Sequence, residues 1–316
     1  MAHAVRTWRP DRPVDVRATV AALRRGGGDP AMRFAADGGV WRATRTPAGP
    51  ALLHVAVRAG VVEGTAWGEG RDWVLEGLPD LLGARDDDAG FRPRPEHPAL
   101  VQAWRQRRGW RVPRSGAVFE ALAAAAIEQV VTGLEARRAW RRLVHRFGEP
   151  APGPAQADDG PAAGMRLPPT PREWALIPTW EWLRAGVEER RRRVVQVAAR
   201  SAGRLEQTVH LPHADAARAL RSLPGVGVWT AAEVRQRAHG DADAFSFGDY
   251  HAARNVSWAL TGRVLDDDGC AEVIACYEGH RYRVQRLLEL AGVTRPRFGP
   301  RMTLPRHTPA ATRGRS

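Results

Sequence analysis

The sequence predicts an α+β fold, in which a mainly helical core of two lobes follows an N-terminal α/β lobe rich in β-strand. Two observations support this prediction. Residues 10 to about 83 alternate short β-type runs with glycine and proline, whereas apolar residues recur at helical spacing in most of the chain beyond them. The 316 residues exceed what one compact core usually organises. We therefore expect an N-terminal lobe over 1–85, a helical core over 86–292 and a basic tail over 293–316.

The N-terminal lobe contains a predicted hairpin. Val40–Thr46 and Ala51–Val57 are β-type runs, and the Pro-Ala-Gly-Pro segment of residues 47–50 separates them. Trp73–Leu82 has apolar residues at helical spacing. The run Asp86–Gly90, with the prolines that follow it, breaks this pattern and indicates a connection between lobes.

The rest of the chain is predicted to be helical over three clear segments, Val118–Gln129, Leu134–Phe147 and Val187–Ala202. The intervening residues 149–171 are rich in Pro, Gly and Ala, which predicts a loop. Four consecutive arginines, 190–193, go round a helix; they favour a solvated face, with a phosphate-binding patch as the alternative. Arg281, Arg283 and Arg286 are expected on an outer basic face.

Composition restricts the classes of function. The net charge of +13 and the isoelectric point near 11.2 favour a polyanionic partner such as nucleic acid. No run of 18 apolar residues and no signal-peptide core is present, so we expect a cytoplasmic, nucleoid-associated protein with no membrane partner. Two cysteines cannot form a four-cysteine cluster, and all 48 basic residues are arginine, which leaves no lysine for a Schiff base.

The most informative motif is Leu223–Ala231, which reads Leu-Pro-Gly-Val-Gly-Val-Trp-Thr-Ala between two helix-like segments, 214–222 and 229–239. Gly225 and Gly227 allow a tight turn and leave backbone N–H groups bare at the start of the second helix, where a phosphate can bind. Taken alone, such a turn could equally be structural. The segment Phe245–His251 then places an aspartate, Asp249, twenty positions after Trp229.

This pattern resembles the helix-hairpin-helix superfamily of DNA glycosylases, and within it the 3-methyladenine DNA glycosylase II family. Phe119–Leu122 leading to Glu128–Thr132, and the Trp-Glu-Trp-Leu segment of residues 180–183, add to the resemblance, which extends over most of residues 10–300. It implies that 86–292 is the glycosylase core and that the N-terminal lobe is the β-rich domain of this glycosylase type. The implied activity is monofunctional excision of alkylated purines from damaged double-stranded DNA by a monomer, in base excision repair.

The resemblance also implies roles for individual residues. Asp249 would be the catalytic carboxylate, stabilising the sugar cation and orienting water, while also able to cap the following helix. Trp229 stands where bifunctional relatives have a catalytic lysine, so an abasic site with an intact strand is expected. The base pocket would include Trp229, Tyr250 and Glu233. The residues in contact with DNA would be Gln129, Val130, Thr132, Leu223, Gly225, Val226, Gly227 and Thr230.

Several of these residues have a second interpretation. Trp229 could stack on a flipped base or pack in the core, and Val130 could be a duplex wedge or a helix-end contact. Glu233 could face a cationic base, although an ion pair with Arg237 is favoured. The expected proline before Asp249 and a tryptophan near Arg283 are missing, which leaves the preferred base undecided.

No organic cofactor is implied, although the resemblance allows the backbone carbonyls of Ser222, Gly225 and Gly227 to hold a monovalent cation. Two alternatives remain open at this stage: a helix-hairpin-helix protein that binds DNA structures without cleaving bonds, and a glycosylase for deaminated or oxidised bases. The first would not need a carboxylate at the hairpin. The second depends on the shape of the pocket.

Overall fold

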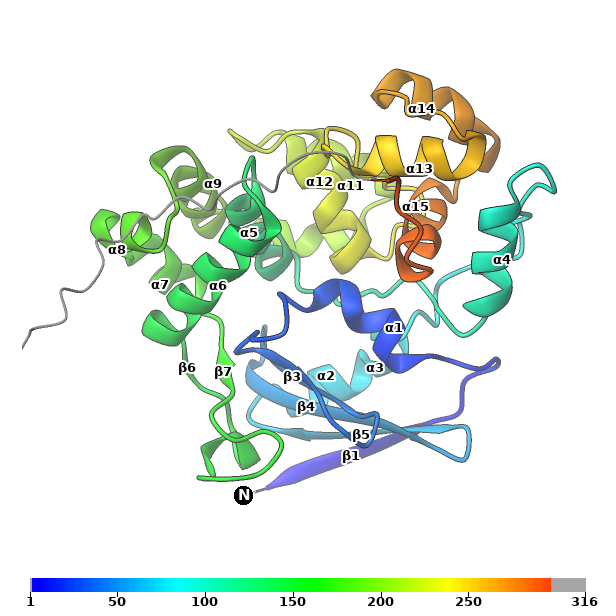
Figure 1. The fold of residues 1–316 in the computed structure, drawn as a ribbon. Helices are drawn as coiled ribbons and strands as arrows, with labels where there is room; N and C mark the ends of the chain where they lie inside the picture. The colour runs from blue at the N-terminus through cyan, green and yellow to red at the C-terminus, as the bar shows by residue number, and fades with distance from the viewer. Residues whose placement is uncertain (1, 297–316) are drawn as a thin grey trace, which may run out of the picture.

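The computed structural model describes residues 2–296, and the fold confirms the α+β class. Most of the expected basic tail, residues 297–316, lies outside the described residues. No helix within residues 2–296 has the length and apolar character needed to cross a membrane. Figure 1 shows a sheet at one end of the molecule and a helical body packed above it.

The N-terminal lobe is built on a five-stranded antiparallel sheet in the order β1-β5-β4-β3-β2. The predicted hairpin is confirmed, because β3 pairs with β4 in antiparallel register. The predicted helix over 73–82 is interrupted at Gly77, so two short helices cover the sheet instead of one. The elements of this lobe are β1 (His3–Trp8), α1 (Val16–Val20), η1 (Ala21–Leu23), β2 (Met32–Phe34), β3 (Val40–Thr46), β4 (Gly49–Arg58), β5 (Val61–Trp67), α2 (Arg71–Glu76) and α3 (Leu78–Leu81).

The helical body has two hydrophobic cores. In the first, the alanine-rich α5 is buried along nearly its whole length and packs against α6, α9 and α12. In the second, α4 and α13 to α15 pack together. The elements are α4 (Pro98–Gln106), α5 (Val118–Glu128), α6 (Gly133–Phe147), α7 (Pro171–Leu176), α8 (Thr179–Arg184), α9 (Glu189–Arg200), α10 (Ala202–Glu206), η3 (Gln207–His210), α11 (His213–Arg221), α12 (Val228–Val234), η4 (Arg235–His239), α13 (Ala252–Thr261), α14 (Asp267–Ile274), η5 (Ala275–Tyr277) and α15 (Arg281–Leu290).

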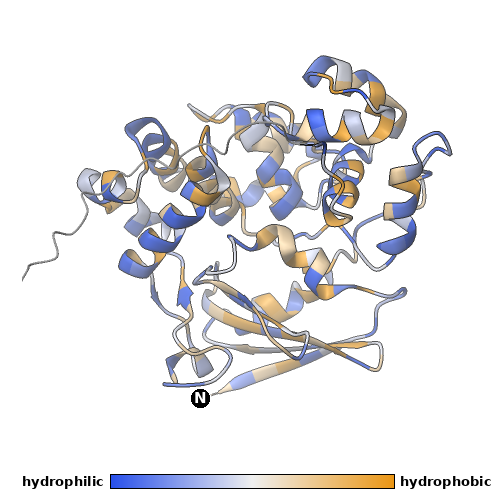
Figure 2. Ribbon diagram, viewed as in Figure 1, coloured by the Kyte–Doolittle hydropathy of each residue, from blue (hydrophilic) through white to orange (hydrophobic). Residues whose placement is uncertain are grey.

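Helix boundaries follow from capping and from the distribution of apolar residues. Thr132 begins α6 with a capping box, in which its hydroxyl accepts from the backbone N–H of Glu135 and the Glu135 carboxylate accepts in return. The buried side of α6 is apolar and its other side is rich in arginine, which Figure 2 shows as a largely hydrophilic ribbon. The helix therefore lies on the surface of the first core.

Residues 149–171 are not simply a loop. Their ends form a two-stranded sheet, β6 (Glu149–Pro150) with β7 (Arg166–Leu167), around a short turn, η2 (Gly153–Gln156). Ala151 and Met165 bury Trp41 on the sheet face that α1 to α3 leave uncovered. Composition predicts a loop here because the Pro and Gly content is high, but tertiary packing against an aromatic face orders the segment.

The two arginine clusters are only partly solvated. Arg283 is completely buried, forming an ion pair with Asp86 in which its two terminal nitrogens lie 2.5 and 3.0 Å from the carboxylate oxygens. Arg191 is also buried and donates to the carbonyl of Ile127 at 2.9 Å. The expected outer basic face is therefore wrong for Arg283, and the expected solvated face is wrong for Arg191. Each guanidinium is buried because a polar partner lies within the fold, the carbonyl of Ile127 for Arg191 and the carboxylate of Asp86 for Arg283. These partners are distant in sequence, so the arginine runs alone do not reveal them.

Candidate active site

The Leu223–Ala231 motif forms a hairpin between α11 and α12. Leu223 and Val226 point inward to the first core, whereas Pro224, Gly225 and Gly227 are exposed. The first N–H groups of α12 have no acceptor within their own helix, because an α-helix leaves its first four donors unpaired. The hairpin therefore presents bare backbone donors at the surface.

Gly225 is required at its position by two features of the fold. Its φ of +83° lies in the left-handed region, and a Cβ built on it would come within 2.5 Å of Cγ2 of Val194 on α9. Gly227 differs, because its φ is −88° and a Cβ there would meet nothing within 4 Å. Gly225 thus sets how closely the hairpin packs on α9, and Gly227 keeps the outer surface bare.

Asp249 lies in the turn that connects the two helical cores, just before α13. Its Oδ1 atom accepts the backbone N–H groups of His251 at 2.7 Å and Ala252 at 2.9 Å. The turn is anchored from outside, because the N–H of Gly248 donates to Oδ2 of Asp267 at 2.7 Å. Two amides at a helix start fix the orientation of the carboxylate. The N-cap position of α13 belongs to His251, and Asp249 contributes to capping by accepting the N–H groups of that residue and of Ala252.

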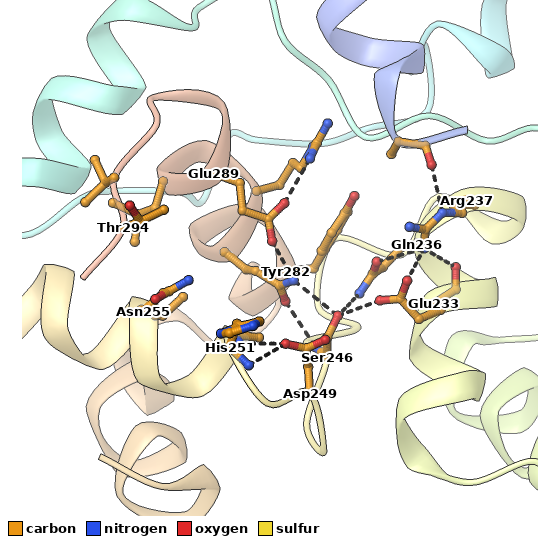
Figure 3. A pocket seen from close by; sticks show the side chains of 17 residues that line it. Glu233, Gln236, Arg237, Ser246, Asp249, His251, Asn255, Tyr282, Glu289 and Thr294 are labelled. Carbon is orange, nitrogen blue, oxygen red and sulfur yellow. Dashed lines mark hydrogen bonds and ion pairs between the residues drawn. The ribbon is translucent and has the colours of Figure 1, made fainter. Parts of the chain in front are cut away.

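A cavity of about 210 Å³ opens beside Asp249, between the two helical cores. Figure 3 shows its side chains converging from α12 and η4 on one side and from α13 and α15 on the other. Ala22 of the N-terminal lobe completes the wall. The polar and aromatic lining consists of Glu233, Gln236, Arg237, Ser246, Asp249, His251, Asn255, Tyr282, Gln285, Arg286, Glu289 and Thr294.

Ser246 is the centre of a hydrogen-bond network on this wall. Its hydroxyl donates to Oε1 of Glu233 at 2.8 Å and accepts from the amides of Gln236 at 2.8 Å and Gln285 at 3.2 Å. Gln285 also accepts the N–H of Ser246 and donates to Glu289 at 2.9 Å. Because the network satisfies these groups internally, it makes a rigid polar wall.

Glu233 is buried, and its carboxylate lies 2.7 Å from the guanidinium of Arg237, so the favoured ion pair is confirmed. Burial raises the pKa of Glu233 above its ordinary value, and Arg237 opposes that rise. Arg237 sits on the π-helical turn η4 and also donates to the carbonyl of Ala22 at 2.8 Å. The pair therefore ties the cavity wall to the N-terminal lobe.

Two polar groups of the cavity are not used by this network. The side-chain amide of Asn255 and the hydroxyl of Tyr282 have no hydrogen-bond partner within residues 2–296. Tyr282 is almost fully buried, and burial raises its pKa to about 12, so its phenol is neutral at physiological pH. Figure 3 shows the Tyr282 ring along one wall, with Asn255 reaching in from α13. These groups can therefore bind a molecule that enters.

The other two residues expected in the pocket, Trp229 and Tyr250, do not line this cavity, although Tyr250 lines a second hollow that also includes Asp249. Trp229 does not line the cavity; its Cβ lies 3.6 Å from the position a Cβ would take on Gly248. Its indole N–H is buried and unpaired within the described part of the chain. Tyr250 is 66% exposed, and the guanidinium of Arg254 stacks on one face of its ring, 4.6 Å from the ring centroid. Of the three expected pocket residues, only Glu233 lines this cavity.

The turn after α5 lies beside the hairpin. The amide of Gln129 donates to the carbonyl of Gly225 at 3.0 Å and to the hydroxyl of Thr230 at 2.9 Å. Val130 is 90% exposed, and Thr132 caps α6. The structure therefore brings residues 129–130 and 223–230 together, although almost a hundred residues separate them in sequence.

Sequence reasoning missed Ser246, Asn255, Tyr282 and Gln285. Tyr282, Gln285 and Glu289 are spaced three and four residues apart on α15, which places them on one helical face, but the neighbouring arginines obscured that pattern. Ser246 stood within the segment already singled out for Asp249. Asn255 gave no signal in the sequence.

The fold, a β-rich lobe joined to a two-lobed helical body, matches that of helix-hairpin-helix DNA glycosylases of known structure. The 3-methyladenine DNA glycosylase of Archaeoglobus fulgidus superposes with a TM-score of 0.71 at 18% identity, covering 89% of this chain and 96% of that one. The 8-oxoguanine glycosylase/lyase of Clostridium acetobutylicum, solved with double-stranded DNA, gives 0.64 at 11% identity over 87% and 90%. MBOgg1, also solved with a DNA ligand, gives 0.65 at 15% identity over 91% and 97%.

No protein-family model matches the sequence, and no curated protein matches it. The relationship is therefore one of fold, and the chemistry has to be argued from the side chains of this chain.

Proposed function

We propose that this protein is a monofunctional DNA glycosylase of base excision repair, of the DNA-3-methyladenine glycosylase II type, that removes alkylated purines from damaged double-stranded DNA. One observation carries the proposal. Asp249 lies at the edge of a cavity, near the Leu223–Ala231 hairpin, and one of its carboxylate oxygens accepts hydrogen bonds from two backbone amides. A protein that only bound DNA structure would need the hairpin but not the carboxylate or the cavity.

We expect the cavity to receive one extrahelical base. Its volume of about 210 Å³ far exceeds the roughly 10–15 Å³ that a single buried water requires. The hairpin would bind the phosphate backbone through Leu223, Gly225, Val226, Gly227 and Thr230, which positions the duplex without reading its sequence. Val130 would enter the stack where the base has left, as an exposed apolar side chain can.

The charges of the cavity favour a cationic base. Three carboxylates, on Asp249, Glu233 and Glu289, face two guanidinium groups, on Arg237 and Arg286. Glu233 pairs with Arg237 and Glu289 with Arg286, whereas Asp249 pairs with no arginine among the described residues. An alkylated purine would bring a positive charge into a cavity that has one more carboxylate than guanidinium groups, and the Tyr282 ring can stack on the face of the base.

Asp249 would act on the sugar rather than on the base. The N-glycosidic bond breaks with its electron pair going to the base, which leaves as a neutral alkylpurine, and positive charge develops on the sugar. Asp249 stabilises that charge and orients a water whose oxygen bonds to C1′ and whose proton passes to the carboxylate or solvent. Because the chain has no lysine, no side-chain Schiff base forms, and the product is an abasic site in an intact strand.

A second candidate function, excision of a deaminated or oxidised base, is favoured by the free polar groups of Asn255 and Tyr282. Polar groups that line a pocket without a protein partner discriminate in favour of ligands that satisfy them. A neutral base offers hydrogen-bonding atoms on its edge that could do so. The same cavity would then select by hydrogen bonding rather than by charge.

Base release tests both candidates. Methylated duplex DNA should release free 3-methyladenine and 7-methylguanine with the wild type, without nicks before alkali, and release should fall at least a hundredfold in Asp249→Asn. A panel of duplexes with one deaminated or oxidised base decides between the candidates. Release from neither substrate set would overturn the glycosylase proposal and support DNA binding without catalysis.

The remaining parts of the proposal concern partners. We expect a monomer that needs no organic cofactor and acts in the cytoplasm at the nucleoid. A monovalent cation at Ser222, Gly225 and Gly227 would share two carbonyls that already accept hydrogen bonds, from Gln129 to Gly225 and from Ala231 to Gly227. No step of the mechanism depends on that cation.

A further inference from the structure

The turn between α5 and α6 holds an exposed apolar residue in a strained conformation. Val130 has a φ of +55°, in the left-handed region, and its side chain is 90% exposed. A β-branched residue is rare in this region, because its side chain crowds the following carbonyl. Such strain persists only where neighbouring structure determines the backbone.

Both flanks of the turn are held. On the α5 side, the buried Arg191 donates to the carbonyl of Ile127, and Glu128 forms an ion pair with Arg25 at 3.0 Å. On the α6 side, Thr132 forms the capping box that starts the helix. These contacts fix where the turn begins and ends, but none of them touches the hairpin.

Gln129 supplies that connection. It is the last residue before Val130, and its amide nitrogen donates to the carbonyl of Gly225 at 3.0 Å and to the hydroxyl of Thr230 at 2.9 Å. Both amide hydrogens are therefore directed at the hairpin, one at its apex and one at the start of α12. The side chain is held against the protein rather than reaching outward as that of Val130 does.

We propose that Gln129 is a positioning residue that couples the hairpin to the turn, so that binding of a DNA phosphate at the hairpin and insertion of Val130 into the duplex occur as one rigid movement. The inference rests on the proposed function for its DNA partner. It assigns to Gln129 a role inside the protein, in place of the direct DNA contact that the resemblance implies. Without the amide donors, the hairpin still binds DNA, but Val130 leaves its strained conformation.

The test separates binding from insertion. Gln129→Met keeps the length of the side chain and removes both donors, and Thr230→Val keeps the shape of its partner and removes one acceptor. Gln196→Met is the matched control, because Gln196 donates to the carbonyl of Ala175 on α7 at 3.1 Å and forms no hydrogen bond to the hairpin among the described residues. The affinity for undamaged duplex DNA measures phosphate binding by the hairpin. Fluorescence of 2-aminopurine opposite a stable abasic analogue reports insertion and requires no chemistry.

Wild type and Gln196→Met should bind undamaged duplex equally and raise the fluorescence equally. Gln129→Met should bind undamaged duplex within about twofold of wild type and lose roughly tenfold in the insertion equilibrium, as expected for two hydrogen bonds of modest net strength. Thr230→Val should lose less, and adding it to Gln129→Met should cause no further loss, because both act through one contact.

Equal insertion by Gln129→Met and wild type would overturn the coupling, and so would the absence of any insertion signal in the wild type. A Gln129→Met variant that loses affinity for undamaged duplex in parallel with insertion would also overturn it, because the role would then be structural support of the hairpin alone. If insertion depends on Gln129 but no base is released from any substrate, the coupling stands and the proposed glycosylase activity fails.

Discussion

Replacing Gly225 by alanine should displace the hairpin, because alanine is unfavourable there for two separate reasons. Left-handed backbone at a non-glycine residue costs about 1–2 kcal/mol. The overlap with Val194, at 2.5 Å, adds about 1–3 kcal/mol. The loss of glycine freedom in the unfolded chain offsets about 0.4–1 kcal/mol. We therefore expect Gly225→Ala to lower the free energy of unfolding by about 1–5 kcal/mol and to weaken binding to duplex DNA.

A double-mutant cycle isolates the overlap. In a Val194→Ala background the overlap with Cγ2 disappears and the Cβ of residue 194 lies 3.8 Å away, so Gly225→Ala should then cost only the backbone component. The coupling energy from urea unfolding should be about 1–3 kcal/mol, with the double mutant more stable than additivity predicts. Gly227→Ala is the control, with ordinary φ and open space, and should change stability by no more than about 0.5 kcal/mol.

Additive costs of Gly225→Ala and Val194→Ala would show that the hairpin does not rest on α9 as described. Equal destabilisation by Gly225→Ala and Gly227→Ala would refute the distinction drawn between the two glycines. A Gly225→Ala variant that binds duplex DNA as tightly as wild type, with the expected loss of stability, would refute the placement of DNA at this hairpin.

Three further predictions concern stability and base choice. Burial lowers the pKa of His239 to about 4, so between pH 6.5 and 4 the unfolded chain binds a proton at this histidine and the folded chain does not. The free energy of unfolding should therefore fall by about 3 kcal/mol over this range. Urea unfolding should not find this loss in His239→Gln. Arg283→Met should lower the free energy of unfolding by about 3–5 kcal/mol in the same assay, because Asp86 is left as an unpaired buried charge. Arg85→Met, which removes an exposed ion pair, should lower it by less than about 1 kcal/mol. Similar costs for the two variants would contradict the burial of Arg283. Asn255→Ala should change the ratio of kcat/KM between two damaged bases about fivefold or more, as expected for one hydrogen bond, and an unchanged ratio would mean that Asn255 does not contact the base.

Much of the fold could be predicted because its signals are local. The hairpin of Val40–Thr46 with the following strand, the alanine-rich α5 and the amphipathic α6 all show their periodicity within about fifteen residues. The ordering of residues 149–171 was not predictable in this way, since β6 and β7 pair across a proline-rich stretch and are held by Trp41 from another lobe.

The candidate site was predicted unevenly for the same reason. Gly225, Gly227 and Asp249 are marked by backbone requirements and spacing, so a single segment of sequence identifies them. Asn255 and Tyr282 acquire their role only because α13 and α15 enclose one cavity, which is a matter of tertiary packing. Trp229 illustrates the converse: its position in the motif predicted a base platform, but it does not line the cavity.

Binding of two abasic analogues tests the central claim, that Asp249 stabilises positive charge on the sugar. Duplexes carrying a cationic pyrrolidine or a neutral tetrahydrofuran at the same position should differ at least a hundredfold in Kd with the wild type, because the cation mimics the transition state. Asp249→Asn should bind the two about equally, while Asp268→Asn, an exposed carboxylate nearby, should keep the preference. A preference for the cationic analogue that survives in Asp249→Asn would contradict the account.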